Sequence, residues 1–277
     1  MFYDTAMFRE KLEGTRDERA HAIVVLDPSE SKRLIAKVVP KLPEVQKALQ
    51  KGLFLVSRGV TPAFIVEELL GDTLPKSICT AGIVTDARLA TTIPEQRLGP
   101  WVFRDGKLSD ESWDAAIEKF SATDVAVKGA NAVDPMGNTG ILVQHPAGGT
   151  IGSMWPLLSS RGAHLIQPVS LERLIPSVTE AYFKCGNRLF DRVMGAMVGL
   201  LPVVTSLVVT EIQALEVLTG VHATHVGSGG IGGSEGSVIL ALEGSENTVN
   251  RAYQAVESVK GDAPVTTPEL TPAVTGA

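Results

Sequence analysis

The chain has 277 residues and a formal net charge of -6, and it is 44% hydrophobic but only 5% aromatic. That length can bury a sizeable core, which aliphatic side chains must mainly supply. The negative net charge argues against nucleic-acid binding, because contacts with the phosphate backbone need clustered lysines and arginines. The two cysteines, Cys79 and Cys185, lie far apart in the sequence, so we expect neither a disulfide framework nor a structural zinc site.

The N-terminal twenty residues are charged early and lack an apolar core, so we expect no secretory signal and a cytoplasmic protein. The stretch from Val193 to Val209 carries no charge and approaches the length of a membrane span. Because Pro202 divides it, we interpret it as a buried helix end, a turn at Pro202 and a buried strand. We therefore expect no membrane partner.

The first half of the chain predicts short helices followed by a buried strand. Asp27 or Ser29 can cap a helix, and two prolines divide residues 31–52 into two short helices. The continuous apolar run at residues 53–57 predicts a strand that is covered on both faces. A glycine turn and a helix over residues 64–71 follow, so the unit is strand, turn and helix.

The same alternation continues to residue 169. Asp105-Gly106 predicts a hairpin, and the helix over residues 149–162 has to hold Pro156 in its first turns. The other elements predicted here are strands at 77–86, 123–129 and 163–169 and a helix at 110–120. Repeated short strands and helices predict an α/β fold, a Rossmann-like parallel sheet with helices on both faces.

The pattern changes in the last hundred residues. Residues 177–199 predict a helix, and a strand, a helix, two strands around a glycine-rich connection and a helix capped by Ser245 follow. This order predicts a small ferredoxin-like α+β unit. We expect an α/β domain over 1–175, the ferredoxin-like domain over 176–262 and a loose tail over 263–277.

Two strand-to-helix turns are candidate ligand sites, because ligands of open parallel sheets bind outside the carboxyl ends of the strands. Free N–H groups at a helix start attract phosphate or carboxylate. A purely structural glycine turn is the alternative for each segment. The candidate residues are Arg58, Gly59 and Thr61 in the first turn, and Lys128, Gly129, Asn131, Asp134, His145, Gly148, Gly149 and Thr150 in the second.

Three further features carry weaker signals. Glu235 lies in a glycine cluster, where a flexible hairpin or a subunit-contact loop is the alternative to a nucleophile. His222 and His225 are three apart on a predicted strand and face opposite ways, so they do not predict a shared metal site. Asp86 follows a predicted strand and either faces the same cleft or caps a loop.

The order of "G-x-T-x-A" at residues 59–63 and "D-V-A-x-x-G-A-x-x-V-D-P-x-x-N" at residues 124–138 resembles the phosphosugar isomerase and CoA-transferase superfamily. Ribose-5-phosphate isomerases, methylthioribose-1-phosphate isomerases and the initiation-factor subunits related to the latter carry similar segments. The resemblance covers residues 52–169. It implies a site for a phosphorylated sugar or a similar small anionic metabolite, used by an isomerase without a cofactor.

The chain departs from this pattern where the family's acids stand, because Lys128 and Asn131 occupy those positions. An amide is no general base, and a lysine reverses the local charge. Lys128 then either holds phosphate or acts as an amine catalyst, and Asp134, Asp124 or His145 moves the proton. A non-catalytic ligand-binding or regulatory protein is the alternative to an isomerase, and a CoA transferase using Glu235 is a third. We also expect a homo-oligomer.

Overall fold

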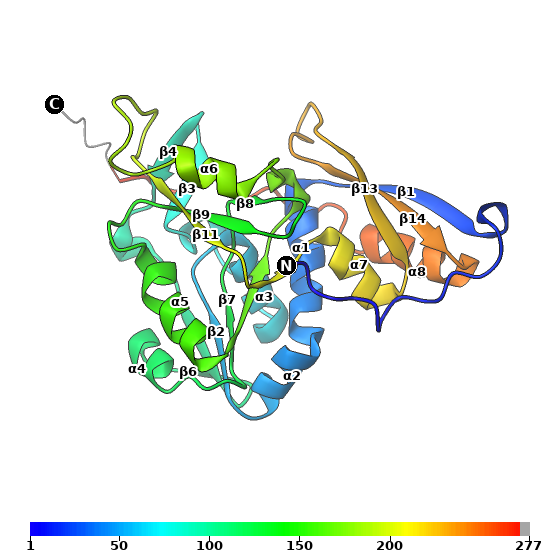
Figure 1. Ribbon diagram of the computed structural model, residues 1–277, viewed down its shortest axis with the longest axis horizontal. Coiled ribbons are helices and arrows are strands. Elements are labelled where there is room, and N and C mark those ends of the chain that lie inside the picture. Colours follow the sequence, from blue (N-terminus) through cyan, green and yellow to red (C-terminus); the bar gives the residue numbers. More distant parts are fainter. Residues whose placement is uncertain (272–277) are drawn as a thin grey trace.

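The computed structural model describes residues 1–271, and a six-stranded mixed sheet lies at its centre (Figure 1). The strand order is β12 (Leu207–Val209), β10 (His164–Pro168), β7 (Val125–Val127), β2 (Leu53–Val56), β5 (Trp101–Arg104) and β6 (Lys107–Ser109). The first four strands are parallel, whereas β5 and β6 form an antiparallel hairpin beside β2. The fold is therefore mixed α/β, and the predicted parallel arrangement holds for four of the six strands.

Side chains along the sheet alternate between two apolar layers. Phe54 and Val56 point into one layer, which they share with α1 (Pro28–Val38), α2 (Pro43–Gln50) and α3 (Val60–Leu70). Leu55 and Ala126 point into the other, with α4 (Trp113–Glu118) and α5 (Gly149–Arg161). Helices cover both faces, as predicted, and the ends of the strands are where open α/β sheets generally bind ligands.

A three-stranded antiparallel sheet lies on the far side of α1 (Figure 1). Its order is β1 (Ala20–Leu26), β14 (Val238–Gly244) and β13 (His222–Ser228), and it packs against α7 (Glu211–Thr219) and α8 (Glu246–Glu257). β1, near the start of the chain, thus pairs with β14, near its end, and β12, which follows residue 175, belongs to the six-stranded sheet. Each of the two sheets therefore contains strands from both sides of residue 175, where the sequence predicted a domain boundary.

Two small sheets complete the fold and correct one prediction. One has the order β11 (Gly199–Val203), β9 (Thr139–Val143) and β8 (Ala132–Val133), and the other pairs β3 (Gly82–Thr85) with β4 (Arg88–Thr91). The apolar run at residues 77–86 was predicted to be a buried strand. Its residues instead form a hairpin that leaves the large sheet, and Val84 is 69% exposed.

Three further predictions differ from the structure, two of them at prolines. Pro156 lies in the middle of α5 rather than in its first turns, and Pro202 lies within β11 rather than at a turn. The helix predicted over residues 177–199 is limited to α6 (Val178–Lys184), because the backbone becomes extended at Cys185, and farther on residues 193–196 bond to β4. There the Leu89 N–H donates to Met194 O. No helix within residues 1–271 is long and apolar enough to cross a membrane.

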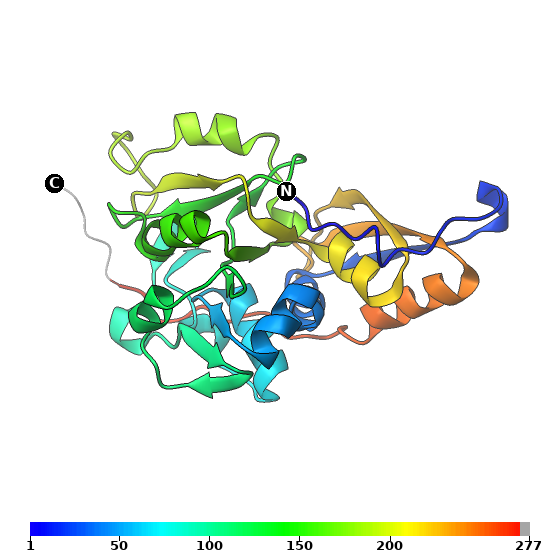
Figure 2. The ribbon, with the colours of Figure 1, turned by 60° about the horizontal axis from the view of Figure 1, so that its bottom comes forward.

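The described part of the predicted tail returns to the large sheet's side of the molecule (Figure 2). The Thr271 N–H donates to Thr91 O, and Leu270 forms an isolated bridge with Thr92. These bonds tie residues that follow α8 to the β3–β4 hairpin. The rest of the predicted tail, residues 272–277, lies outside the described residues.

Candidate functional site

The two candidate turns leave neighbouring parallel strands at the same edge of the sheet. β2 and β7 pair directly, and beyond their last paired residues the Ser57 N–H donates to Val127 O at 3.0 Å. A Cβ added at Gly129 would lie 3.5 Å from Cδ of Pro62 in the first turn of α3. The carboxyl ends of β2 and β7 therefore form one continuous rim, at which Pro62 lies next to Gly129.

The start of α3 offers unused hydrogen-bond donors at this rim. The Gly59 N–H donates to Cys79 O at 2.7 Å, whereas the Val60 and Thr61 N–H groups have no acceptor within residues 1–271. Thr61 is only 9% exposed, and its hydroxyl makes no hydrogen bond in this part of the chain. Because the dipole of an eleven-residue helix adds positive potential here, the first turn of α3 is suited to an anion.

Three cations lie at this edge without an ion pair in residues 1–271. Lys128, which is mostly buried, approaches the Arg58 carbonyl oxygen at 3.4 Å, and burial lowers the pKa of Lys128 to about 8. Burial and the neighbouring charge of Arg97 lower the pKa of the Arg58 guanidinium. Burial also lowers the pKa of Arg97, although the charge of Glu95 opposes this shift. None of the three cations has a carboxylate within 4 Å among the described residues.

Backbone contacts hold the two arginines in place. The Arg58 Nε donates to Leu98 O at 3.2 Å, and the Arg97 Nε donates to the Thr92 hydroxyl at 2.8 Å. Both guanidiniums therefore keep further N–H donors for a ligand. Arg97 was missed at the sequence level, because it comes from the loop before β5 and no motif links it to the β2 turn.

Asn131 and Asp134 have structural partners of their own. The Asn131 side-chain oxygen accepts from the Leu142 N–H of β9. Asp134 is 3% exposed and accepts from the N–H groups of Met136, Asn138 and Val178. Burial opposes ionisation of Asp134, but these bonds outweigh it and lower the pKa of the carboxyl. Because these hydrogen bonds occupy the carboxylate oxygens of Asp134 and stabilise its charged form, Asp134 is poorly suited to be a general base.

The turn before α5 follows β9, a strand of another sheet. His145 is exposed, and its Nδ1 accepts from the Ala147 N–H at 3.1 Å. Gly148 and Gly149 have φ of 80° and 57°, which favours glycine at both positions, and Thr150 lies in the first turn of α5. Within the described chain no hydrogen bond joins this turn to Lys128 or Arg58.

The weaker candidates have contacts of their own and no hydrogen bond to Lys128 or Arg58 among the described residues. Asp124 stands at the amino end of β7, where it accepts from the Leu53 N–H. Asp86 has a φ of 49° at the tip of the β3–β4 hairpin, and Glu235 accepts from the Gly233 N–H in an exposed loop. His222 and His225 bond to different partners, and residues 1–271 hold no cluster of three metal-ligating side chains.

A buried polar cluster follows the next two strands, β10 and β12, and was not predicted. Lys32 pairs with Glu172 at 2.8 Å, and the Leu171 N–H donates to Glu211 Oε2 at 3.0 Å. Glu211 is completely buried, and burial raises the pKa of its carboxyl. Its Oε1 and the Ser31 hydroxyl have no partner among the described residues. A glutamate at a helix start gives no sequence signal for such burial.

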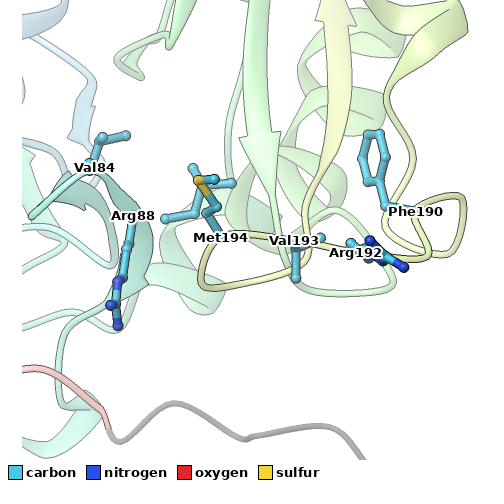
Figure 3. A pocket seen from close by; sticks show the side chains of 8 residues that line it. Val84, Arg88, Phe190, Arg192, Val193 and Met194 are labelled. Carbon is cyan, nitrogen blue, oxygen red and sulfur yellow. The ribbon is translucent and has the colours of Figure 1, made fainter.

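A shallow hollow lies elsewhere on the surface, between the β3–β4 hairpin and residues 190–194 (Figure 3). It has a volume of about 290 Å³ and a mainly apolar lining that includes Val84, Val193 and Met194. Arg88 and Arg192 stand on either side of Met194 and Val193 in Figure 3. None of the predicted site residues lines it.

Comparisons of the chain with models of known protein families, with curated proteins and with solved structures found no match.

Proposed function

We propose that the protein binds a small anionic metabolite, with its phosphoryl or carboxylate group at the rim formed by β2 and β7. The observation that carries the proposal is the set of partly buried cations, Lys128, Arg58 and Arg97, which forms no ion pair in residues 1–271 and lies beside the free N–H groups of α3. Burying a charge without a counter-charge is costly. A bound anion would remove that cost.

Within this proposal the ligand is a phosphorylated sugar or a close relative, as the resemblance of the two turns implies. The four parallel strands would then serve as a Rossmann-like unit, and β1, β13 and β14 with their helices as a ferredoxin-like one. The surroundings of Asp134 and His145 favour binding over the proton transfer of an aldose–ketose isomerase. We therefore propose a ligand-binding or regulatory role ahead of an isomerase.

The ligand can be tested by calorimetry with ribose 5-phosphate, ribose and inorganic phosphate. We expect the first and third to bind and ribose not to bind. Arg58→Ala removes one donor and should weaken binding by on the order of tenfold, or about 1.4 kcal/mol. Arg188→Ala, at an exposed arginine outside the rim, is the matched control. Equal affinity of Arg58→Ala and the wild type would remove this rim from the binding site.

The proton balance of binding gives an independent measurement. The pKa of Lys128 is about 8 in the free protein because burial disfavours its charge, and a neighbouring anion favours it. Phosphate binding at pH 8 should therefore take up as much as about half a proton per site, in addition to any exchange at the phosphate itself. Titrations in buffers of different ionisation enthalpy measure this uptake, and Lys128→Met should lose it. Identical proton uptake by wild type and Lys128→Met would contradict the proposal.

A further inference from the structure

We propose that Lys128 forms an imine with the carbonyl carbon of a phosphorylated aldehyde or ketone bound at the β2–β7 rim. This inference rests on the proposed function, and it adds a covalent step and a substrate class. The ligand would place its phosphoryl group at the first turn of α3 and its carbonyl at Lys128 Nζ. The carbonyl compound, rather than phosphate alone, would then be the substrate.

The surroundings of Nζ suit a nucleophilic amine. Its one hydrogen bond within residues 1–271 is to the Arg58 carbonyl oxygen at 3.4 Å, the long end of the hydrogen-bond range. No carboxylate of the described residues lies within 4 Å to hold the ammonium form. Lys128 is mostly buried, but the residue is not completely enclosed. The amine is therefore not paired with an acid in residues 1–271.

The protonation state of Lys128 also favours a nucleophilic amine. With a pKa of about 8, about half of the Lys128 side chains are neutral at pH 8. An unperturbed lysine, with a pKa near 10.4, would be almost wholly protonated at that pH. Burial alone lowers the pKa here, because no neighbouring charge contributes to it.

The neighbouring groups can orient the carbonyl. The Arg58 carbonyl oxygen accepts a long hydrogen bond from Nζ, and Arg58 is the residue before Gly59, which caps α3. The Arg58 carbonyl and the free Val60 and Thr61 N–H groups belong to three consecutive peptide units of one turn. A ligand held by its phosphoryl group on this turn would therefore have its other end near the amine.

The step is balanced without a further reactant. The neutral Lys128 amine attacks the carbonyl carbon, a C–N bond forms, and a proton shift from nitrogen to oxygen gives a carbinolamine. Loss of the hydroxyl with the second amine proton releases one water and leaves the C=N bond. Hydrolysis by the same water reverses it, so no oxidant or reductant is needed. The imine is an electron sink for proton loss at the adjacent carbon.

The experiment traps the imine with cyanoborohydride. The full-length protein is incubated at pH 8 with dihydroxyacetone phosphate or ribose 5-phosphate, and peptide mass spectrometry locates the reduced adduct. We expect one adduct, on Lys128, that excess inorganic phosphate suppresses at least tenfold. Lys128→Arg keeps the charge but cannot form an imine, so it should lose the adduct and retain phosphate binding. Lys107→Ala, at an exposed lysine, should label like the wild type.

The outcomes separate this inference from the proposed function. Phosphate binding with no adduct on Lys128 overturns the imine and leaves the anion site in place. Failure of phosphate to bind, or an adduct that phosphate does not suppress, overturns both. Adducts spread evenly over exposed lysines show adventitious glycation and also overturn the imine. A thermal unfolding midpoint for Lys128→Arg close to that of the wild type shows that its lost label is not a folding defect.

Discussion

At the scale of single residues, local hydrogen bonds decide whether the pKa of a buried carboxyl group is raised or lowered in this protein. Asp134 and Glu211 are both buried carboxyls. Asp134 accepts several backbone bonds, and the pKa of its carboxyl falls despite burial. Glu211 keeps one oxygen without a partner in the described chain, and burial raises its pKa. Burial lowers the pKa of Lys128, whereas it raises the pKa of Glu211, because in both cases it favours the neutral form of the group.

Glu211→Gln should stabilise the protein at alkaline pH. The folded-state pKa of Glu211 lies above its unfolded value, so its contribution to stability is present below the unfolded pKa of about 4.5 and is lost as pH rises through the folded pKa. The amide keeps an oxygen for the Leu171 N–H and carries no charge. At pH 8 we expect a gain of roughly 1–3 kcal/mol, the scale of an uncompensated buried polar group.

Urea unfolding of wild type and Glu211→Gln between pH 4 and pH 9 checks this. The difference in unfolding free energy should grow with pH. Glu211→Ala is the control for shape and hydrogen bonding, because it leaves the Leu171 N–H without its acceptor and should be destabilised at every pH. A pH-independent difference between Glu211→Gln and wild type would show that Glu211 is ionised normally.

At the scale of elements, Asp134 links two segments that the sequence separates. Its oxygens accept from Asn138, in the turn between β8 and β9, and from Val178, the first residue of α6. One side chain therefore fixes both a tight turn and the start of a helix. This explains why an aspartate that the sequence offers as a proton carrier is found in a structural role.

Asp134→Ala should loosen α6 and lower stability. It leaves several buried N–H groups without acceptors, so we expect a loss of about 3 kcal/mol. Because the folded-state pKa of Asp134 lies below its unfolded value, its contribution is present above the unfolded pKa of about 3.9 and is lost as pH falls through the folded pKa. Amide hydrogen exchange at Val178 and urea unfolding at pH 7 and pH 3 measure both effects. Unchanged exchange at Val178 would contradict this role.

The sequence predicted local elements better than their partners. Asp27 and Ser245 stand at the predicted helix starts, and the Asp105-Gly106 turn joins β5 and β6 as predicted. These features depend on neighbours within a few residues. The β1–β14 pair and the approach of Arg97 to Arg58 depend on residues far apart in the chain, which periodicity does not reveal. The rim itself was predictable, because parallel strands end at one edge.

At the scale of the whole molecule, one apolar core spans both larger sheets. Val24 and Leu26 of β1 belong to the same buried cluster as Phe54 and Val56 of β2. α1 lies between the sheets and contacts both α3 and α7 (Figure 1). The arrangement makes the two sheets interdependent, although they are built around different strands.

Thermal unfolding should therefore show one cooperative transition. Leu242→Ala removes a buried side chain from β14, and a loss of about 2–5 kcal/mol is expected. Differential scanning calorimetry should show a single peak in the wild type and a single peak, at lower temperature, in Leu242→Ala. Two peaks, of which only one moves, would show that the sheets unfold independently.

The pairing of β1 with β14 also governs the order in which the chain can fold as it is synthesised. Arg19, just before β1, bonds to Glu243 of β14, and 224 positions separate them. β1 therefore leaves the ribosome long before β14, the strand with which it pairs. Until β14 emerges, β1 presents an unpaired edge with the aliphatic Ile23 and Val25, the kind of strand on which chaperones act.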